Sequence, residues 1–227
     1  MQLDRSIGRR LFLVFNYLFL ALIALICLAP MWHTLSASFS SPVELNAHRG
    51  LLWYPVGEFT LKGYEIVFKN SAIWRSYLNT LIYVVGGTLV GISMTAIGAY
   101  TLSRRYFRPR NVLMLLITFT MLFNGGMIPN YMLIHKLGLY NTAWALILPT
   151  AINVFHLIIL RTAFMGIPPE MEESAKIDGA NDLQIFLRII VPVSKASISV
   201  IVLFIAVMHW NSWFPASLYL SDRAKYP

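Results

Sequence analysis

Long apolar blocks separated by short polar segments dominate this sequence. Five blocks are long enough to cross a bilayer, which takes about 20 mostly apolar residues in a helix, and none of them contains Asp, Glu, Lys or Arg. The first block is Leu11–Trp32, and the others lie within Leu78–Leu102, Asn111–Ile134, Leu137–Leu160 and Ala196–Ser221. Because backbone groups in lipid must be hydrogen bonded within their own segment, each block is predicted to be a helix.

Two of the blocks carry residues that bear on helix packing. Gly87 and Gly91 stand four residues apart, a spacing of small residues that lets two helices approach closely. Glycines that are merely tolerated, without a partner helix, would give the same pattern. Residues 124–126, Asn-Gly-Gly, and Pro129 predict a break or kink near the outer end of the third block.

The loops between the blocks differ in their content of Lys and Arg. Three segments hold 11 of the 18 basic residues: the N-terminus, the loop after the second block, and residues 161–195. These residues are Arg5, Arg9, Arg10, Arg104, Arg105, Arg108, Arg110, Arg161, Lys176, Arg188 and Lys195. Because cytoplasmic loops of membrane proteins carry the excess of Lys and Arg, the three segments are predicted to be cytoplasmic.

Composition supports a membrane protein, since 57% of the residues are hydrophobic and 12% are charged, against about 25% charged in soluble domains. A net charge of +8 could indicate a protein that binds nucleic acid. Here the basic residues flank apolar blocks, so the lipid bilayer is the predicted partner and binding to nucleic acid is not predicted. Cys27 is the single cysteine and is interpreted as a packing residue. No Cys, Asp or Glu lies at ligand spacing near the histidines of the blocks, so no metal site is predicted.

The one long polar segment on the predicted cytoplasmic side is Pro168–Lys195. It holds five of the ten acidic residues, Glu170, Glu172, Glu173, Asp178 and Asp182. Pro169 suits the first turn of a helix, and acidic residues near that end favour the helix dipole. Gly179 supplies the left-handed residue that ends many helices. The segment therefore begins with a predicted short helix.

A second helix is predicted from Leu183 to Val191. Asn181 or Asp182 can cap its beginning. Its predicted apolar face consists of Leu183, Phe186, Leu187 and Ile190. Pro192 is predicted to end the helix before the last apolar block.

This segment resembles the EAA loop of ABC importer permeases. In that pattern Glu-Ala-Ala is followed after three residues by Gly, and after nine more by Ile, any residue, a hydrophobic residue and Pro. The matching residues are Glu173, Ala175, Gly179, Ile189 and Pro192, with Asp178 before the glycine as is common in the family. Ser174 replaces the middle alanine, and because serine is also small we expect the docking surface to be retained.

The resemblance implies that residues 166–195, called the coupling segment below, contain a short helix that inserts into a groove on a separate ATP-binding cassette subunit. Closure of that subunit on ATP would push the segment and switch the membrane helices between inward-facing and outward-facing states. Glu173 would make charged contacts there, and Gly179 would allow the bend. A generic amphipathic cytoplasmic hairpin remains the alternative.

Four further stretches resemble carbohydrate-uptake permeases of the maltose-permease type, and more narrowly the branch for complex oligosaccharides. They are residues 124–129, 137–142, 144–149 and 210–213. The resemblance covers nearly all of residues 1–227 and implies a single transmembrane domain with the all-α, MetI-like bundle fold. Such permeases have six spans with both termini inside. We therefore expect that a sixth span and the tail after it are missing, because the sequence is either a fragment or a truncated gene product.

The resemblance also implies the partners of the chain. These are the separate ATPase, a second permease subunit, and an extracytoplasmic solute-binding protein that selects the sugar. The location would be the bacterial cytoplasmic membrane, with the N-terminus of this chain inside. The sequence has no GxxxxGK[ST] phosphate loop and no recognisable catalytic motif, so we expect neither an enzyme nor a cofactor.

Polar and aromatic side chains in or near the blocks are candidates for a sugar path, since sugars bind through ring stacking and hydrogen bonds. The candidates are Asn124, Asn153, Phe155, Trp210, Asn211 and Trp213. For the two tryptophans, the interfacial belt of any membrane protein is an alternative. For Asn153 and Asn211 the alternative is hydrogen bonding between helices.

Two other functions compete with an ATP-driven importer. An ion-coupled secondary transporter often carries Asp or Glu relays within its spans, and the five blocks have none. A membrane scaffold without a transport path is contradicted only by the coupling segment.

Overall fold

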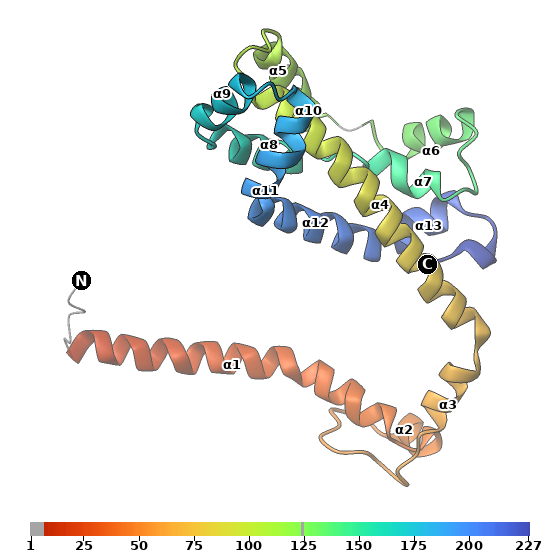
Figure 1. Cartoon of the computed structure of the whole chain (residues 1–227). Helices are drawn as coiled ribbons and strands as arrows, with labels where there is room; N and C mark the ends of the chain where they lie inside the picture. The colour runs from red at the N-terminus through yellow and green to blue at the C-terminus, as the bar shows by residue number, and fades with distance from the viewer. Residues whose placement is uncertain (1–6, 124) are drawn as a thin grey trace. The chain divides into compact units, whose positions relative to one another are not determined.

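The computed structural model describes residues 7–123 and 125–227, and within those ranges every regular element is a helix. This confirms the all-α prediction. The chain divides into two compact units, Met1–Ile73 and Trp74–Pro227. Figure 1 shows the helices with their labels.

The first unit contains α1 (Ile7–Ser38), α2 (Pro42–Ala47) and α3 (Lys62–Lys69). α1 has 32 residues, includes the predicted span Leu11–Trp32, and exposes apolar side chains around its whole circumference. An all-apolar, exposed surface of this length is stable in lipid and not in water. The loop after α2 is fastened to the end of α1, where Trp32 Nε1 donates a hydrogen bond to the Trp53 carbonyl at 2.7 Å.

The second unit holds the remaining elements. α4 (Ser71–Ser103) begins just before the boundary between the units. The others are α5 (Arg110–Thr120), α6 (Met127–Lys136), α7 (Trp144–Ile147), η1 (Leu148–Thr150), α8 (Val154–Met165), α9 (Pro169–Ile177), α10 (Asp182–Ile185), the π-helical turn η2 (Phe186–Ile190), α11 (Val191–Val193), α12 (Lys195–Trp210), α13 (Trp213–Tyr219) and η3 (Arg223–Lys225).

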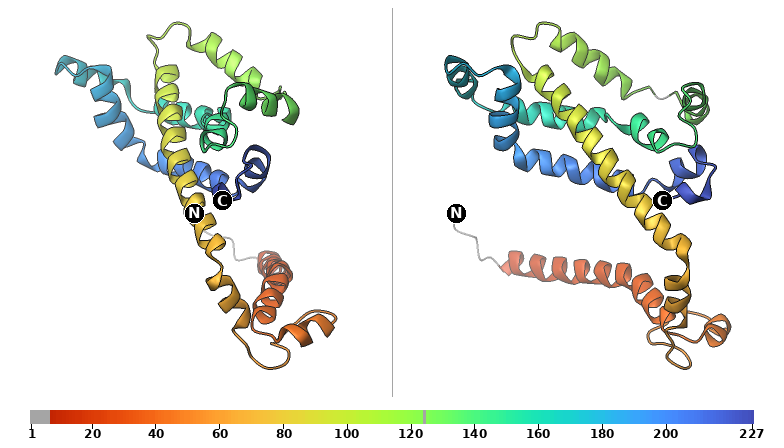
Figure 2. Two further views of the ribbon diagram at one scale, coloured as in Figure 1. Left: turned by 90° about the vertical axis from the view of Figure 1, so that its right-hand side faces the viewer. Right: turned by 45° about the vertical axis from the view of Figure 1, so that its right-hand side comes forward.

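α8 and α12 lie side by side in this unit, and α4 crosses them (Figures 1 and 2). Glycines on α4 make the close crossing possible. A Cβ atom at Gly87 would overlap the imidazole ring of His209, and one at Gly91 would lie 3.3 Å from Ile205 Cγ2. His209 is 1% exposed and Ile205 2%. The predicted small-residue pair thus has a partner, and that partner is α12.

Three of the predicted spans are not continuous helices. α5 has only 11 residues and ends at Thr120, earlier than the predicted break, and Gly126 with φ +87° precedes α6. Residues 144–165 bend by 52° before α8. The last predicted span, Ala196–Ser221, is divided into α12 and α13 by a turn at residues 211–212, and the chain also bends by 84° at Ser194, just before that span. Among the described residues, α1 and α4 are long and apolar enough to cross a membrane, and the number reaches four if each bent pair is one span. Five spans therefore stay a prediction.

A second, smaller core fixes the end of the chain. It is formed by Tyr83, Leu146, Ala216 and Leu220. Asn141, at φ 59°, uses its side-chain oxygen to accept hydrogen bonds from the backbone N–H groups of Ser221 and Asp222, both at 3.2 Å. Asn79 Nδ2 donates to the carbonyls of Ala224 and Tyr226. The segment after α13 is thereby tied to α4 and to the loop before α7.

Candidate functional site

The coupling segment begins with a regular short helix. α9 starts at Pro169, which needs no hydrogen-bond acceptor at that position. The helix carries Glu170 and Glu172 in its first turn and Lys176 in its last, so both ends match the helix dipole. Gly179 follows with φ +82°. This confirms the predicted left-handed residue, because side chains other than glycine rarely adopt that conformation.

A capping box begins the second helix. Asn181 Oδ1 accepts from the backbone N–H of Gln184 at 2.9 Å, and the Asn181 N–H donates to Gln184 Oε1 at 3.0 Å. Asn181, rather than Asp182, is therefore the cap. Helical structure continues to Val193, so Pro192 lies inside the last turn and does not end the helix.

The predicted apolar face of the second helix is partly wrong. Leu183 and Leu187 are 64% and 55% exposed, whereas Ile185 and Ile190 are fully buried. The reason is the π-helical turn η2. A π-helical turn bonds residues five apart, so Ile185 and Ile190 share the buried face. Phe186 and Ile190, which the prediction placed on that face, are buried as expected.

The buried side of the coupling segment is part of the main core of the second unit. Ala175, Ile185, Phe186 and Ile190 pack in one cluster with side chains of α4, α8 and α12. The rings of Tyr100 on α4 and Phe186 have centroids 5.1 Å apart. A displacement of the coupling segment therefore disturbs the same apolar contacts that hold the long helices together.

The exposed side carries most of the residues that match the EAA pattern. Glu173, Ser174, Asp178 and Gly179 are exposed, together with Pro192. Ala175 is buried and Ile189 is packed at the edge of the core. The matched residues thus divide into a solvent-facing set, around the end of α9 and at Pro192, and a set that anchors the segment.

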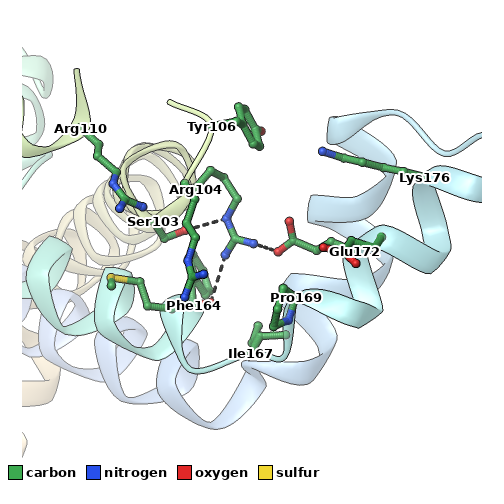
Figure 3. Close-up of a pocket in the computed structure, with 12 residues that line it drawn as sticks. Ser103, Arg104, Tyr106, Arg110, Phe164, Ile167, Pro169, Glu172 and Lys176 are labelled. Atoms are coloured by element: carbon green, nitrogen blue, oxygen red, sulfur yellow. Dashed lines mark hydrogen bonds and ion pairs between the residues drawn. The ribbon is translucent and has the colours of Figure 1, made fainter. Parts of the chain in front are cut away.

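One buried ion pair joins the coupling segment to α4. Arg104, directly after α4, pairs its Nη1 with Glu172 Oε1, and the two side chains are only 8% and 11% exposed. Arg104 Nε donates to Ser103 Oγ at 2.9 Å and Nη2 to the Phe164 carbonyl at 3.0 Å (Figure 3). All three guanidinium nitrogens are therefore engaged, which is the condition under which a buried arginine is tolerated.

Burial lowers the pKa of the Arg104 guanidinium, because the charged form loses hydration, while the phenol groups of Tyr100 and Tyr106 act in the opposite direction. The Tyr100 ring also lies under the guanidinium, 4.8 Å from its central carbon, in cation–π geometry. The charged form of Arg104 is thus supported from several directions.

A second arginine makes the reciprocal contact between the long helices. Arg161 Nε on α8 donates to the Leu102 carbonyl of α4 at 2.9 Å, while Arg104 binds the carbonyl of Phe164 on α8. Each arginine satisfies a carbonyl at the end of the other helix, which such ends leave without an intrahelical donor. In the sequence, both residues contributed only to the prediction of which loops are cytoplasmic. A charged residue inside the last apolar turn of a helix could have indicated the role.

A cavity of about 550 Å³ opens beside this ion pair. It lies between the end of α4, the start of α5, the end of α8 and the first turns of α9. Its lining consists of Ser103, Arg104, Arg105, Tyr106, Arg110, Phe164, Met165, Ile167, Pro169, Glu172, Glu173 and Lys176. Figure 3 shows Arg104 and Arg110 on one side of the cavity and Lys176 on the other.

Two candidates for the sugar path use their side chains locally. Asn153 caps α8 and accepts from the backbone N–H groups of Phe155 and His156, at 2.9 and 3.3 Å. Asn211 Nδ2 donates to the Val207 carbonyl at 2.8 Å, at the end of α12. Asn124 lies outside the described residues.

The aromatic candidates are exposed. Phe155, Trp210 and Trp213 are 54%, 53% and 71% exposed. A cavity of about 250 Å³ between α6 and α13 is lined by Gly126, Met127, Asn130, Phe214, Pro215, Leu218 and Tyr219, which include none of the five candidates that lie in the described part of the chain. The sugar-path residues stay a prediction. Among residues 7–123 and 125–227, no group of three or more His, Cys, Asp or Glu could hold a metal ion.

Residues 87–222 match the family described as "Binding-protein-dependent transport system inner membrane component". The chain belongs to this family. It is 47% identical over 218 residues, 96% of its length and 76% of the relative, to the polygalacturonan/rhamnogalacturonan transport system permease protein YtcP of Bacillus subtilis (strain 168). It is 44% identical to protein LplC of the same organism, over 96% of this chain and 73% of that protein.

The structure resembles one chain in the crystal structure of a bacterial ABC transporter involved in the import of the acidic polysaccharide alginate. The TM-score is 0.93 and the sequence identity 33%, over 100% of this chain and 80% of that chain. The fold is therefore that of an ABC importer permease. This protein is accordingly a component of the cytoplasmic membrane and a transport subunit, and the ion-coupled transporter and scaffold hypotheses are not favoured.

Proposed function

We propose that this permease subunit moves an oligosaccharide across the cytoplasmic membrane, driven by a separate ATP-hydrolysing subunit that docks on the coupling segment. The observation that carries the proposal is the two-sided construction of that segment. Glu173 and Ser174 face solvent, while neighbouring Glu172 and Ala175 are buried against α4 and the core. A partner that binds the exposed side can therefore displace the helices held by the buried side.

We propose acidic oligosaccharides as the first cargo to test. The names of the similar proteins support this choice, because one refers to polygalacturonan and rhamnogalacturonan and the other to the acidic polysaccharide alginate. The six sugar-path candidates and the cavity between α6 and α13 are proposed contact regions, since aromatic rings and amide groups suit sugar rings.

The proposed assembly contains a second permease subunit, the ATP-binding cassette subunit and an extracytoplasmic solute-binding protein. The chain would supply five spans, with its N-terminus in the cytoplasm and both compact units in one transmembrane domain. Lys and Arg in the predicted cytoplasmic segments support this orientation.

The test is a charge reversal at the exposed acid, Glu173→Arg, in the assembled transporter reconstituted in proteoliposomes with its binding protein. Uptake of labelled oligogalacturonide and substrate-stimulated ATP hydrolysis are both measured. We expect each rate to fall by at least about tenfold, because removing one partner of a hydrogen-bonded charge pair at an interface costs about 2–5 kcal/mol.

Glu170→Arg is the matched control, because Glu170 lies on the same helix, is also exposed, and lies outside the EAA match. It should retain most of both rates. Equal loss in the two variants would indicate a general effect of charge on α9. Normal uptake and ATP hydrolysis in the Glu173 variant would show that the ATPase does not bind this surface.

A further inference from the structure

The cavity beside the Arg104–Glu172 pair has an excess of positive charge. Its lining contains the four cationic side chains Arg104, Arg105, Arg110 and Lys176, against the two carboxylates Glu172 and Glu173. The Arg104–Glu172 pair is internally neutral. Cations therefore outnumber acids in the remaining lining, and this imbalance favours an anionic ligand.

Arg110 contributes the clearest unmet bonding capacity. Its Nη1 atom is buried and has no hydrogen-bond partner among the described residues. Leaving a buried charged donor unsatisfied is costly, and a bound anion would remove that cost. Arg110 is also the first residue of α5, where the helix dipole adds positive potential instead of compensating the guanidinium.

The other side of the cavity is held in place by local contacts. Lys176 Nζ lies 4.7 Å from the centre of the Tyr106 ring and 3.6 Å from Asp182 Oδ1. Both interactions leave ammonium N–H groups available, since an ammonium has three donors. Figure 3 shows Tyr106 above the space between Arg104 and Lys176.

The position of the cavity identifies the kind of anion. It opens where the apolar helices α4 and α8 end, and its rim includes Met165, which is 51% exposed, and Pro169. Basic pockets between membrane helices on the cytoplasmic side suit anionic lipid headgroups. The volume of about 550 Å³ lies within the usual range of about 300–1,000 Å³ for ligand pockets, so a phosphate with an attached glycerol headgroup fits.

We propose that this cavity is a binding site for a phosphate group, presented by the headgroup of an anionic phospholipid. Arg105 binds the phosphate oxygens from the loop after α4, Arg110 from the start of α5, and Lys176 from α9. Because the cavity is built partly from α9, the lipid contacts the coupling segment directly. The cavity shares Glu173 with the surface proposed above for ATPase docking, but lipid binding is a function beyond oligosaccharide transport.

The test uses the assembled transporter in nanodiscs of phosphatidylcholine with an increasing share of phosphatidylglycerol. Retained lipids are counted by native mass spectrometry after transfer to detergent. We expect wild-type protein to retain phosphatidylglycerol preferentially, and Arg110→Gln to weaken its apparent affinity by at least about tenfold, because a direct hydrogen bond between charged groups is lost. Arg105→Gln should act in the same direction.

Arg108→Gln is the matched control, because Arg108 lies in the same loop, removes the same charge and does not line the cavity. It should change retention by no more than about fivefold, the effect of one basic side chain near an anionic lipid surface, and by less than Arg110→Gln. A parallel titration with inorganic phosphate in detergent separates the sources. Competition by phosphate alone would support the site and assign it to free phosphate, whereas retention that resists phosphate supports the lipid. Equal retention in Arg110→Gln, Arg108→Gln and wild type, with no phosphate binding, would overturn the proposal.

Discussion

The Arg104–Glu172 pair makes a quantitative prediction about what holds the coupling segment to the membrane helices. Removing one partner of a buried ion pair leaves the other charge uncompensated and costs about 3–5 kcal/mol. Arg104→Met also removes the two hydrogen bonds to Ser103 and Phe164, each worth about 1 kcal/mol. Arg104→Met should therefore destabilise the protein more than Glu172→Leu does.

The double variant Arg104→Met/Glu172→Leu separates the pair from the packing. Apolar residues of similar volume often replace a buried ion pair without loss. The double variant should therefore be more stable than either single variant, with an interaction free energy of about 3 kcal/mol. The assay is equilibrium unfolding of the purified chain in mixed micelles with increasing SDS.

The exposed pair Lys69–Glu65 is the matched reference, because its side chains are 74% and 60% exposed. Surface pairs of this kind contribute about 0–1 kcal/mol. If the interaction free energy of Arg104 and Glu172 is no larger than that of Lys69 and Glu65, the buried pair does not fasten the coupling segment and the reasoning fails.

Three further predictions concern backbone and packing. Gly87→Val should prevent close packing on His209 and lower the yield of folded protein in detergent gel filtration, whereas Gly86→Ala, whose Cβ would lie 3.6 Å from the nearest side-chain atom, should not. Gly179→Val should destabilise the turn by roughly 1–2 kcal/mol in SDS unfolding, and Gly179→Asn should destabilise it by less. An equal loss of stability in the two variants would contradict a conformational cause. Asn181→Ala should lower the free energy of unfolding by about 1 kcal/mol through the lost cap and should speed proteolysis in the coupling segment. An unchanged rate of proteolysis would show that the cap is dispensable.

The sequence predicted the local features of the coupling segment well because those features depend on neighbouring residues. Pro169 at the start of α9 and the left-handed Gly179 each follow from chemistry within a few positions. The same chemistry limited the cap to Asn181 or Asp182, and the structure has Asn181. The π-helical turn η2 was missed, since its five-residue spacing depends on how the segment packs on α4 and α8.

Continuity of the apolar blocks was the other weak point. Hydrophobic length predicts that a segment enters the membrane, but not whether it stays helical throughout, because irregular backbone is tolerated inside protein or along a cavity. The bend before α8 and the turn between α12 and α13 were therefore not predicted, whereas a helix end close to Ser194 was predicted from Pro192. Arg104 and Glu172 were invisible as a pair for a related reason, since nothing local brings residues so far apart in the sequence together.

The contacts of α9 also limit how a push on the coupling segment can be transmitted. Because hydrogen bonds weaken steeply beyond their normal length, sliding α9 away from α4 would break the Arg104–Glu172 pair at a cost of about 3–5 kcal/mol. Moving α9 with the ends of α4 and α8 avoids that cost, so these three should shift as one body, with bending at Ser194, where the chain already turns by 84°.

Spin labels at the exposed positions Thr162 and Ile177 would report this in the assembled transporter. Their separation should be the same with and without bound ATP, whereas that between Ile177 and Leu203, across Ser194, should change; a change confined to the first pair would place the moving joint at the ion pair.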